Sequence, residues 1–412
     1  MKAATSVPQS PRRPASAGEA AAPTSAASPA ASATGPASPN RYLVKSVVHA
    51  AAVLAAFRKA GEELGLREVV ARSGLSKGIC FRILYTLHEC GMLEKLGENQ
   101  YRLAGRREGE RRKFRVGYAD QDRNSSFSRE LFEGLVRACQ QAQVELITVD
   151  NRRDPESALK SAGRLIHERV DVAIEFQIDE RTAPSIAERF QAANVPLIAI
   201  DIPHPGAIYY GVDNYAVGLV GGHCLGNFIK QKWHGIVDEV LLLEISRAGS
   251  LVRMRTDGIL AGLEESLPAG KRKVERLDGK GEFKSALEQV RRHLRGSAAK
   301  RIAVGAANDP MALAAVRAFQ ECGRAAHCAV VGQNAEPEVR AELRQAGTPL
   351  VGSVATFPER YGEAVMKLAT ELLLGKHIAP ATFTTHQLIT PQNVDRVYPH
   401  DALFPRFARE YN

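Results

Sequence analysis

The sequence predicts an α/β protein, in which a doubly wound parallel sheet follows a smaller helical domain that ends in a β-hairpin. From Phe114 onward, short apolar runs alternate with amphipathic stretches, which is typical of parallel strands joined by helices. Between residues 42 and 105, apolar residues recur at helical spacing and are followed by two short alternating segments. At 412 residues, the chain is long enough for two or three domains.

Composition argues against several classes of protein. No apolar run approaches the roughly 20 residues that cross a bilayer, and the N-terminus lacks the apolar segment of a secretory signal. We therefore expect a cytoplasmic protein with no membrane partner. The six cysteines are scattered, with no pair at two-residue spacing, which argues against a disulfide framework and a zinc site. We expect no metal and no cofactor.

Positive charge is concentrated near the start of the chain. The formal net charge is +9, and residues 41–115 hold sixteen Lys or Arg against eight Asp or Glu. Residues 1–40 carry a net +2, so the remaining 297 residues are close to neutral. A localised basic region is typical of a polyanion-binding domain, because neutralised phosphates release their counterions. Charge alone leaves a solvated basic face as the alternative.

Two segments lack the residues that a core needs. Residues 1–40 consist almost entirely of Ala, Ser, Pro, Thr and Gly, and we expect them to form a disordered tail. Residues 106–113 are charged and have no apolar stripe, which indicates a basic linker. Two folded domains remain, residues 41–105 and residues 114–412.

Three helices are predicted in the first domain. Apolar residues from Leu43 to Ala55 recur at helical spacing and predict the first helix. The second runs from Leu66 to Ser73 and ends at Gly74, which suits a tight turn. Ser76 is expected to cap the third helix, whose apolar residues share one face at about 100° per residue.

The opposite face of the third helix carries basic and aromatic side chains together, which favours contact with nucleic acid. Arg82 can donate to guanine, and Phe81 can contact a thymine methyl group. The alternative is that Phe81 or Tyr85 packs on the first helix or on a second copy. Two alternating segments then predict a hairpin that lies along the minor groove or the backbone of the DNA. The predicted DNA-contacting residues are Lys45, Ser76, Lys77, Gly78, Phe81, Arg82, Tyr85, Lys95 and Arg102.

Five blocks occur in order and at compact spacing in this domain. They are Lys45-Ser-Val47, Leu75-Ser-Lys77, Arg82-Ile-Leu-Tyr-Thr-Leu87, Gly91-Met-Leu93 and Gln100-Tyr-Arg-Leu103. Together they resemble the winged helix-turn-helix of the isocitrate-lyase-regulator (IclR) type. The resemblance implies that the third helix enters the major groove of a double-stranded DNA operator.

The second domain contains repeated strand candidates with polar residues after almost every one. The strand candidates are Phe114–Ala119, Val144–Val149, Val170–Phe176, Val195–Ile200, Val240–Ile245, Ile302–Ala306 and Ala329–Val331. Ligands of parallel sheets bind beyond the carboxyl ends of the strands, so we expect one shared cleft. The domain has no Gly-x-Gly-x-x-Gly, Gly-x-Ser-x-Gly or His-Glu-x-x-His pattern, and we predict no catalytic residues.

Eight further blocks recur in order over roughly residues 114–390. They include Val116-Gly-Tyr118, Val149-Asp-Asn151, Val195 to Asp201, Gly211-Val-Asp-Asn214, Arg253 to Gly258 and Ala307 to Leu313. They resemble the sugar-binding type I periplasmic-binding-protein family. The resemblance implies two lobes that hold a small polar ligand, a sugar or sugar derivative, between them. Lobe 1 is expected at about 114–212 and 357–386, and lobe 2 at about 213–356 and 387–412.

The same resemblance implies a set of ligand-binding residues. They are Asn124, Phe127, Gln177, Asp201, Arg253, Phe283, Asn308, Asn334 and Thr356. Ribose-type members differ at four positions, where this chain has Ser128, Ile202, Asn334 and Thr356. The identity of the ligand therefore stays open, and a strand-end cap or a turn former is the alternative for each residue.

These features predict a transcriptional regulator whose affinity for an operator is controlled by the ligand in the cleft. A homodimer is expected, because symmetric recognition helices read two half-sites. A solute-binding receptor of a sugar transport system is one alternative, against which the basic first quarter and the missing signal argue. A cytoplasmic enzyme acting on a sugar is another, and turnover of a cleft ligand would establish it.

Overall fold

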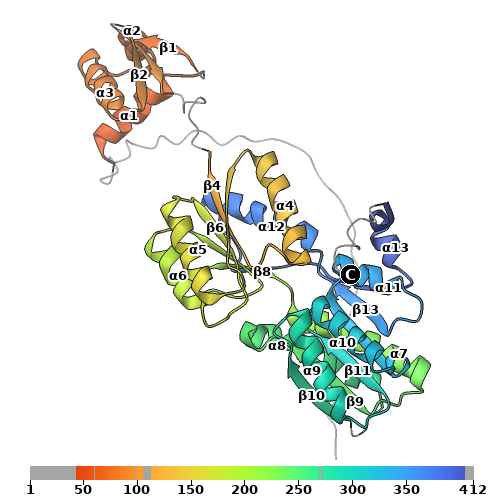
Figure 1. The fold of residues 1–412 in the computed structure, drawn as a ribbon. Helices are drawn as coiled ribbons and strands as arrows, with labels where there is room; N and C mark the ends of the chain where they lie inside the picture. The colour runs from red at the N-terminus through yellow and green to blue at the C-terminus, as the bar shows by residue number, and fades with distance from the viewer. Residues whose placement is uncertain are drawn as a thin grey trace, which may run out of the picture. The chain divides into compact units, whose positions relative to one another are not determined.

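The computed structural model describes residues 43–104 and 113–403, except residues 60, 98, 269 and 271 (Figure 1). Two compact units divide the chain, Met1–Arg111 and Arg112–Asn412. The predicted tail and all but the last residue of the predicted linker lie outside the described residues. Within the described part, no helix is long and apolar enough to span a membrane.

The first unit is a small helical domain with a three-stranded antiparallel sheet of order β1-β3-β2. Its core is formed by the apolar faces of the helices, and Val53, Val69, Cys80 and Leu84 are completely buried. Its elements are α1 (Lys45–Ala55), β1 (Glu63–Gly65), α2 (Leu66–Ser73), α3 (Lys77–Glu89), β2 (Leu93–Leu96) and β3 (Gln100–Leu103).

The turn between α2 and α3 follows from its local sequence. Gly74 ends α2 with a φ of 68°, a conformation that residues with a Cβ rarely adopt. The buried Cys80 thiol of α3 holds the turn by donating to the Leu75 carbonyl at 3.8 Å. Ser76 stands at the N-cap position of α3, but its side chain makes no capping hydrogen bond there. Its hydroxyl group therefore does not stabilise the helix start as the sequence predicts.

Lobe 1 of the second unit is a six-stranded sheet of order β14-β8-β7-β6-β4-β5, whose pairings are parallel. Helices α4 and α12 pack on one face, and α5 and α6 pack on the other. Its elements are β4 (Arg115–Asp120), α4 (Ser126–Ala142), β5 (Glu145–Asp150), α5 (Pro155–His167), β6 (Val172–Phe176), α6 (Ala183–Ala192), β7 (Leu197–Ile200), β8 (Ile208–Gly211), α12 (Pro358–Leu373) and β14 (Ala381–Phe383).

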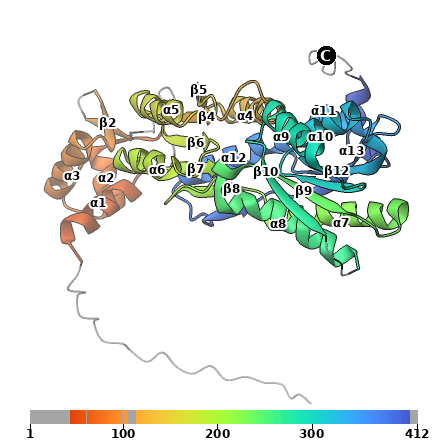
Figure 2. The ribbon, with the colours of Figure 1, turned by 60° about the horizontal axis from the view of Figure 1, so that its bottom comes forward.

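Lobe 2 repeats this plan with a sheet of order β10-β9-β11-β12-β13-β15, in which only β15 is antiparallel to its neighbour. Its elements are α7 (Asn214–Trp233), β9 (Glu239–Glu244), η1 (Ser246–Ala248), α8 (Gly249–Ser266), β10 (Lys273–Asp278), α9 (Phe283–Gly296), β11 (Ile302–Ala306), α10 (Asp309–Glu321), η2 (Ala325–His327), β12 (Cys328–Asn334), α11 (Pro337–Leu343), β13 (Leu350–Ala355), β15 (Gln387–Ile389), α13 (Val394–Val397) and η3 (Pro399–Leu403). In Figure 2, α9, α10 and α11 lie above this sheet, with α7 and α8 below it.

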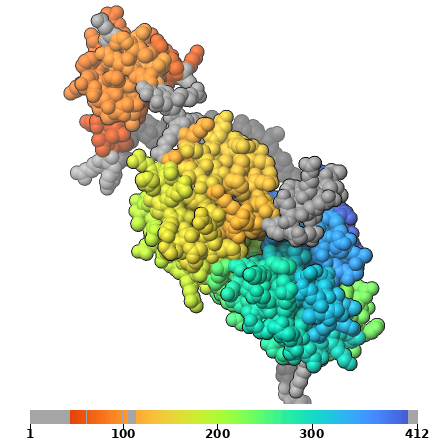
Figure 3. All heavy atoms as spheres, in the orientation of Figure 1, coloured from red at the N-terminus to blue at the C-terminus, as the bar shows by residue number. Residues whose placement is uncertain are grey.

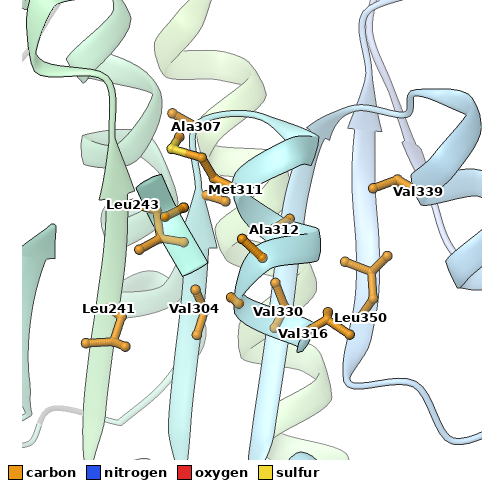
Figure 4. Close-up of a cluster of buried hydrophobic side chains, with 14 of the residues drawn as sticks. Leu241, Leu243, Val304, Ala307, Met311, Ala312, Val316, Val330, Val339 and Leu350 are labelled. Atoms are coloured by element: carbon orange, nitrogen blue, oxygen red, sulfur yellow. The ribbon is translucent and has the colours of Figure 1, made fainter. Parts of the chain in front are cut away.

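Alternate residues of each central strand enter the two apolar layers of lobe 2. Leu241 and Leu243 lie in the same apolar layer as Met311 and Val316 of α10 (Figure 4). Their neighbours Val240 and Leu242 enter the opposite layer with α7 and α8. Strands buried on both faces are apolar at every position, which explains why the sequence shows them as continuous runs.

The strands that sequence patterning missed are mostly short or polar. Strand β10 lies at the edge of its sheet and has no fully buried residue, and β14 and β15 have three residues each. Strand β8 is buried but only four residues long, and β13 carries Gly352 and Ser353 among its apolar residues. The predicted fold class, a winged helix-turn-helix followed by a two-lobed α/β domain, is confirmed.

Candidate functional site

The exposed face of α3 presents the residues predicted to read DNA. Lys77, Gly78, Phe81, Arg82 and Tyr85 are all exposed, and Phe81 and Tyr85 keep 53% and 56% of their surface accessible. Apolar side chains of the same helix, such as Cys80, Leu84 and Leu87, are buried instead. Neither aromatic ring belongs to the core that the described residues of the first unit form, so the helix offers a face with both apolar and basic groups.

The remaining predicted DNA residues differ in their surroundings. Lys45 and Lys95 are exposed. Arg102 is half-buried on β3, where its Nη2 donates to Glu94 Oε2 at 2.7 Å and its Nη1 lies 3.7 Å from Glu63 Oε1. The hydrogen bond that Arg102 donates to Glu94 raises the pKa of Arg102. The structure therefore gives Arg102 partners inside the sheet, where it supports the hairpin, and its contact with DNA stays a prediction.

The cleft of the second unit lies where strands of both lobes end. A cavity of about 90 Å³ is lined from both lobes, whose surfaces adjoin in Figure 3, yellow for lobe 1 and teal for lobe 2. Its lining residues include Gln121, Phe127, Arg153, Phe176, Gln177, Asp201, Arg255, Gly281, Asn308, Asn334 and Glu336. This space is smaller than the roughly 300–1,000 Å³ of most ligand pockets, so the two lobes lie close together in this structure.

Five of the nine predicted ligand residues line this cavity: Phe127, Gln177, Asp201, Asn308 and Asn334. The other four are placed elsewhere. Asn124 is exposed before α4, and Phe283, the first residue of α9, is 42% exposed. Thr356 is completely buried behind the lining, where its hydroxyl group donates to Asn334 Oδ1 at 3.3 Å. It can orient Asn334 but does not itself face the cavity.

Arg253 is replaced at the cleft by Arg255. Residues two apart on a helix point about 200° apart, so the two arginines of α8 face in different directions. Arg253 is exposed and lines a separate hollow of lobe 2, with Glu244 and Thr256. Arg255 is buried, and it donates from Nε to Asn214 Oδ1 at 2.9 Å and from Nη1 to the Ala307 carbonyl at 2.7 Å. Its three-residue spacing from the buried Val252 is the sequence signal that could have identified it.

One wall of the cavity is aromatic, and a carboxylate stands beside it. The Phe127 ring is held edge-on by Tyr361, with centroids 5.5 Å apart, and is tilted against Phe176 at 5.6 Å. Asp201 follows β7 and has a φ of 59°. Burial raises the pKa of Asp201 to about 6, although the charge of Arg255 opposes this shift. An apolar ring beside hydrogen-bonding groups suits a small polyol, which has C–H surfaces and hydroxyl groups.

Two buried carboxyl groups at the lobe 2 side of the cleft are not among the predicted ligand residues. Asp309 accepts from the Ser353 hydroxyl at 2.7 Å and from the Glu336 backbone N–H at 2.6 Å. Burial raises the pKa of Asp309 to about 7 and raises that of Glu336 as well. At neutral pH this pair therefore retains protons and contributes less than two negative charges. Among the described residues, no group of His, Cys, Asp and Glu side chains is arranged to hold a metal ion.

Comparison with known families places both units. The family described as "Periplasmic binding protein domain" matches residues 116–377. The chain belongs to this periplasmic-binding-protein family. The family described as "IclR helix-turn-helix domain" matches residues 46–97, which span α1 to β2. An IclR-type DNA-binding domain thus precedes a periplasmic-binding-protein domain in one chain, and both matched families are of binding types.

Relatives of the periplasmic-binding-protein domain include sugar-binding proteins. The ribose import binding protein RbsB of Bacillus subtilis (strain 168) is 25% identical over 273 residues, covering 66% of this chain and 85% of the relative. A solute-binding protein of Actinobacillus succinogenes 130z with bound D-allose superimposes with a TM-score of 0.61 at 18% identity, covering 69% of this chain and 100% of that one. A Bacillus halodurans C-125 protein with bound myo-inositol gives 0.61 at 18% identity, with 71% and 99% covered.

Glu175 is a buried acid next to the cleft-lining residues Phe176 and Gln177 of lobe 1. Its side chain is fully buried at the carboxyl end of β6, and Oε1 accepts a hydrogen bond from Asn151 Nδ2 at 2.7 Å. Burial raises the pKa of Glu175 to about 8. Because the unfolded chain has an ordinary pKa of about 4.3, the folded state holds one more proton between these two values.

The free energy of unfolding should therefore fall as the pH rises from 5 to 8. One extra proton in the folded state lowers it by up to about 1.4 kcal/mol per pH unit, and Asp201 and Asp309 act with the same sign. Glu175→Gln mimics the protonated group, so it should keep the fold and reduce this slope in urea denaturation. Glu156→Gln, on the exposed side of α5, is the control. An undiminished slope in Glu175→Gln would contradict the buried-acid assignment.

Proposed function

We propose that this protein is a cytoplasmic DNA-binding transcriptional regulator whose operator affinity is set by a small sugar or polyol bound between the two lobes. The observation that carries the proposal is the presence, in one chain, of an IclR helix-turn-helix domain and a periplasmic-binding-protein domain. A transport receptor needs no DNA-binding domain, so this combination favours regulation over solute import. The exposed basic and aromatic face of α3 supports the DNA-binding part.

The nature of the cleft supports a polyol as the effector. Phe127 offers an apolar ring, and Asp201, Arg255 and Asn308 offer hydrogen-bonding groups around the same cavity. Relatives of the domain hold D-allose and myo-inositol in their structures. We propose that such a ligand draws the lobes together and thereby changes the spacing or order of paired winged helices. A ligand can shift this equilibrium only by binding one arrangement more tightly than the other.

The first experiment is a thermal-shift screen of the purified protein against monosaccharides, polyols and their acid and phosphate derivatives. A stabilising compound is then added to a titration with the DNA upstream of the protein's own coding sequence, and its effect on DNA affinity is measured. Asp201→Asn should weaken ligand binding by about 1.5–3 kcal/mol, because the charged acceptor is lost. Arg253→Gln, outside the cavity, should bind as the unaltered protein does. If no stabilising ligand changes the affinity for DNA, the proposed sensing function is ruled out.

Arg82 is proposed to read a base in the major groove. Arg82→Ala should cost roughly 1–3 kcal/mol of operator binding and leave ligand binding intact. Arg82→Lys keeps the charge but loses the bidentate fork, so a base-reading role predicts that it is nearly as weak as Arg82→Ala. Fluorescence anisotropy with operator and scrambled DNA measures both variants. If Arg82→Lys retains full operator affinity, the side chain contacts phosphate instead.

A homodimer is proposed to place two recognition helices on two half-sites. An exposed apolar patch at the start of α1 supports this, since Leu43 and Val44 just before the helix and Val47 on it each keep 60% or more of their surface accessible, and Val48 keeps 46%. A second copy is the proposed occupant, because operator reading requires it close by. Val47→Glu should weaken the dimer in sedimentation velocity and lower operator affinity. Ile236→Glu, exposed on the second unit, is the control. If the unaltered protein binds its operator as a monomer, the homodimer proposal is wrong.

A further inference from the structure

Two arginines from opposite lobes meet at the edge of the cleft. Arg153 follows β5 in lobe 1 and lines the cavity, while Arg247 lies in η1 of lobe 2. Arg153 Nη2 donates across the cleft to the Lys280 carbonyl at 3.1 Å, and Arg247 Nη1 donates to the Arg153 carbonyl at 3.2 Å. Backbone contacts thus hold the two guanidinium groups in one place, and neither contact neutralises their charge.

One carboxylate forms ion pairs with both arginines. Glu282 Oε1 lies 3.6 Å from Arg153 Nε and 3.5 Å from Arg247 Nη2. The Nε atoms of Arg153 and Arg247 are both buried and have no hydrogen-bond partner among the described residues. Glu282 Oε1 is too far from Arg153 Nε for a hydrogen bond, so each of the two buried Nε donors has lost water without gaining an acceptor, which is costly.

The surroundings of Arg153 contrast with those of Arg340, another arginine that bridges the lobes. Arg340 pairs with Glu130 at 3.1 Å and with Asp401 at 2.8 Å, and its pKa is raised. The pKa of Arg153 is lowered, first by burial and then by the charge of Arg247, although the carboxyl groups of Glu282, Asp122 and Glu336 oppose this. Glu336 also retains its proton, since burial raises its pKa. Positive charge at this edge of the cleft is therefore incompletely balanced.

We propose that the ligand is an acidic sugar derivative whose anionic group binds between Arg153 and Arg247. This inference rests on the proposed function and names the chemical class of its effector. A carboxylate or phosphate oxygen can accept from the unpartnered Nε atoms, and planar guanidinium groups bind such oxyanions in bidentate fashion. The sugar ring then lies against Phe127, with its hydroxyl groups near Asp201 and Asn308, which line the same cavity.

The position of the two arginines also assigns the anionic group a role in closure. Arg153 and Arg247 come from different lobes, and the single negative charge of Glu282 offsets only one of their two positive charges, so a net repulsion between them remains. An oxyanion between them replaces this repulsion with attraction and therefore binds the closed arrangement more tightly. An acidic ligand should close the lobes more strongly than a neutral sugar of the same skeleton does.

Matched ligand pairs test the inference by isothermal titration calorimetry of the full-length protein. Glucose, gluconate, glucuronate and glucose 6-phosphate form one series, and galactose and ribose with their corresponding acids and phosphates form two more. In at least one series, the acid should bind about 10- to 100-fold more tightly than the neutral sugar, which corresponds to one charge-assisted interaction. Preference for the carboxylates or for the phosphates within that series identifies the kind of anion.

Two neighbouring arginines provide a matched pair of variants. Arg153→Gln should lose the preference for the acid while its affinity for the neutral sugar changes little. Arg152→Gln removes an exposed arginine at the next position, where φ is also positive, and it should keep the preference. Thermal unfolding without ligand verifies that both variants fold.

The outcomes separate this inference from the proposed function. Neutral sugars that bind as tightly as their acids, with a normal effect on DNA affinity, overturn the acidic-ligand inference and leave the regulator intact. An acid preference that persists in Arg153→Gln overturns the assignment to this arginine pair. If no sugar and no acid of the panel binds, both the inference and the sugar-sensing part of the proposed function fail.

Discussion

The second unit depends on the shared direction of its strands. Parallel strands place all their carboxyl ends at one edge of a sheet, and the loops that follow contain backbone groups that the sheet does not pair. In lobe 1 that edge supplies Gln177 and Asp201, and in lobe 2 it supplies Asn308 and Asn334. Because the two edges face one cavity, residues far apart in the sequence form a single polar site.

The contacts between the lobes differ in kind from those within a lobe. Within lobe 2, helices α7 and α8 pack so closely that a Cβ on Gly222 or Gly262 would collide with the backbone of the other helix. Between the lobes, the Ser126 hydroxyl group donates to Glu338 at 2.5 Å, and Arg340 pairs with Glu130. Polar contacts of this kind can be exchanged for water, whereas interdigitated backbone cannot. The proposed closure of the lobes would therefore exchange polar contacts and leave the packing inside each lobe intact.

The first unit uses its apolar residues selectively. Helix α3 buries Cys80, Leu84 and Leu87 and leaves Phe81 and Tyr85 exposed, so its outer face is more apolar than solvent contact requires. The hairpin is held by ion pairs across its sheet, where Arg102 bridges Glu94 and Glu63. A rigid hairpin and an exposed helix face are what a winged helix needs to present to a DNA groove.

The sequence by itself determined the class of the protein and most of its local structure. Helix α2 begins and ends where the pattern predicts, because Gly74 readily adopts the left-handed conformation that ends the helix. Strand β11 has the same bounds as the apolar run that predicts it. Helical spacing also separated the buried from the exposed side of α3. Such features depend on neighbours within a few residues, so periodicity and turn chemistry are sufficient to predict them.

Tertiary structure decided which side chains share a site. Arg253 and Arg255 are two residues apart on α8 and point in different directions, and only Arg255 lines the cavity. The three-residue strand β1 brings Glu63 to Arg102. Arg153, Arg247 and Glu282 meet although more than 90 residues separate the first two. Only packing decides such encounters, because the sequence pattern records that a residue is polar but not which distant group the fold brings to it.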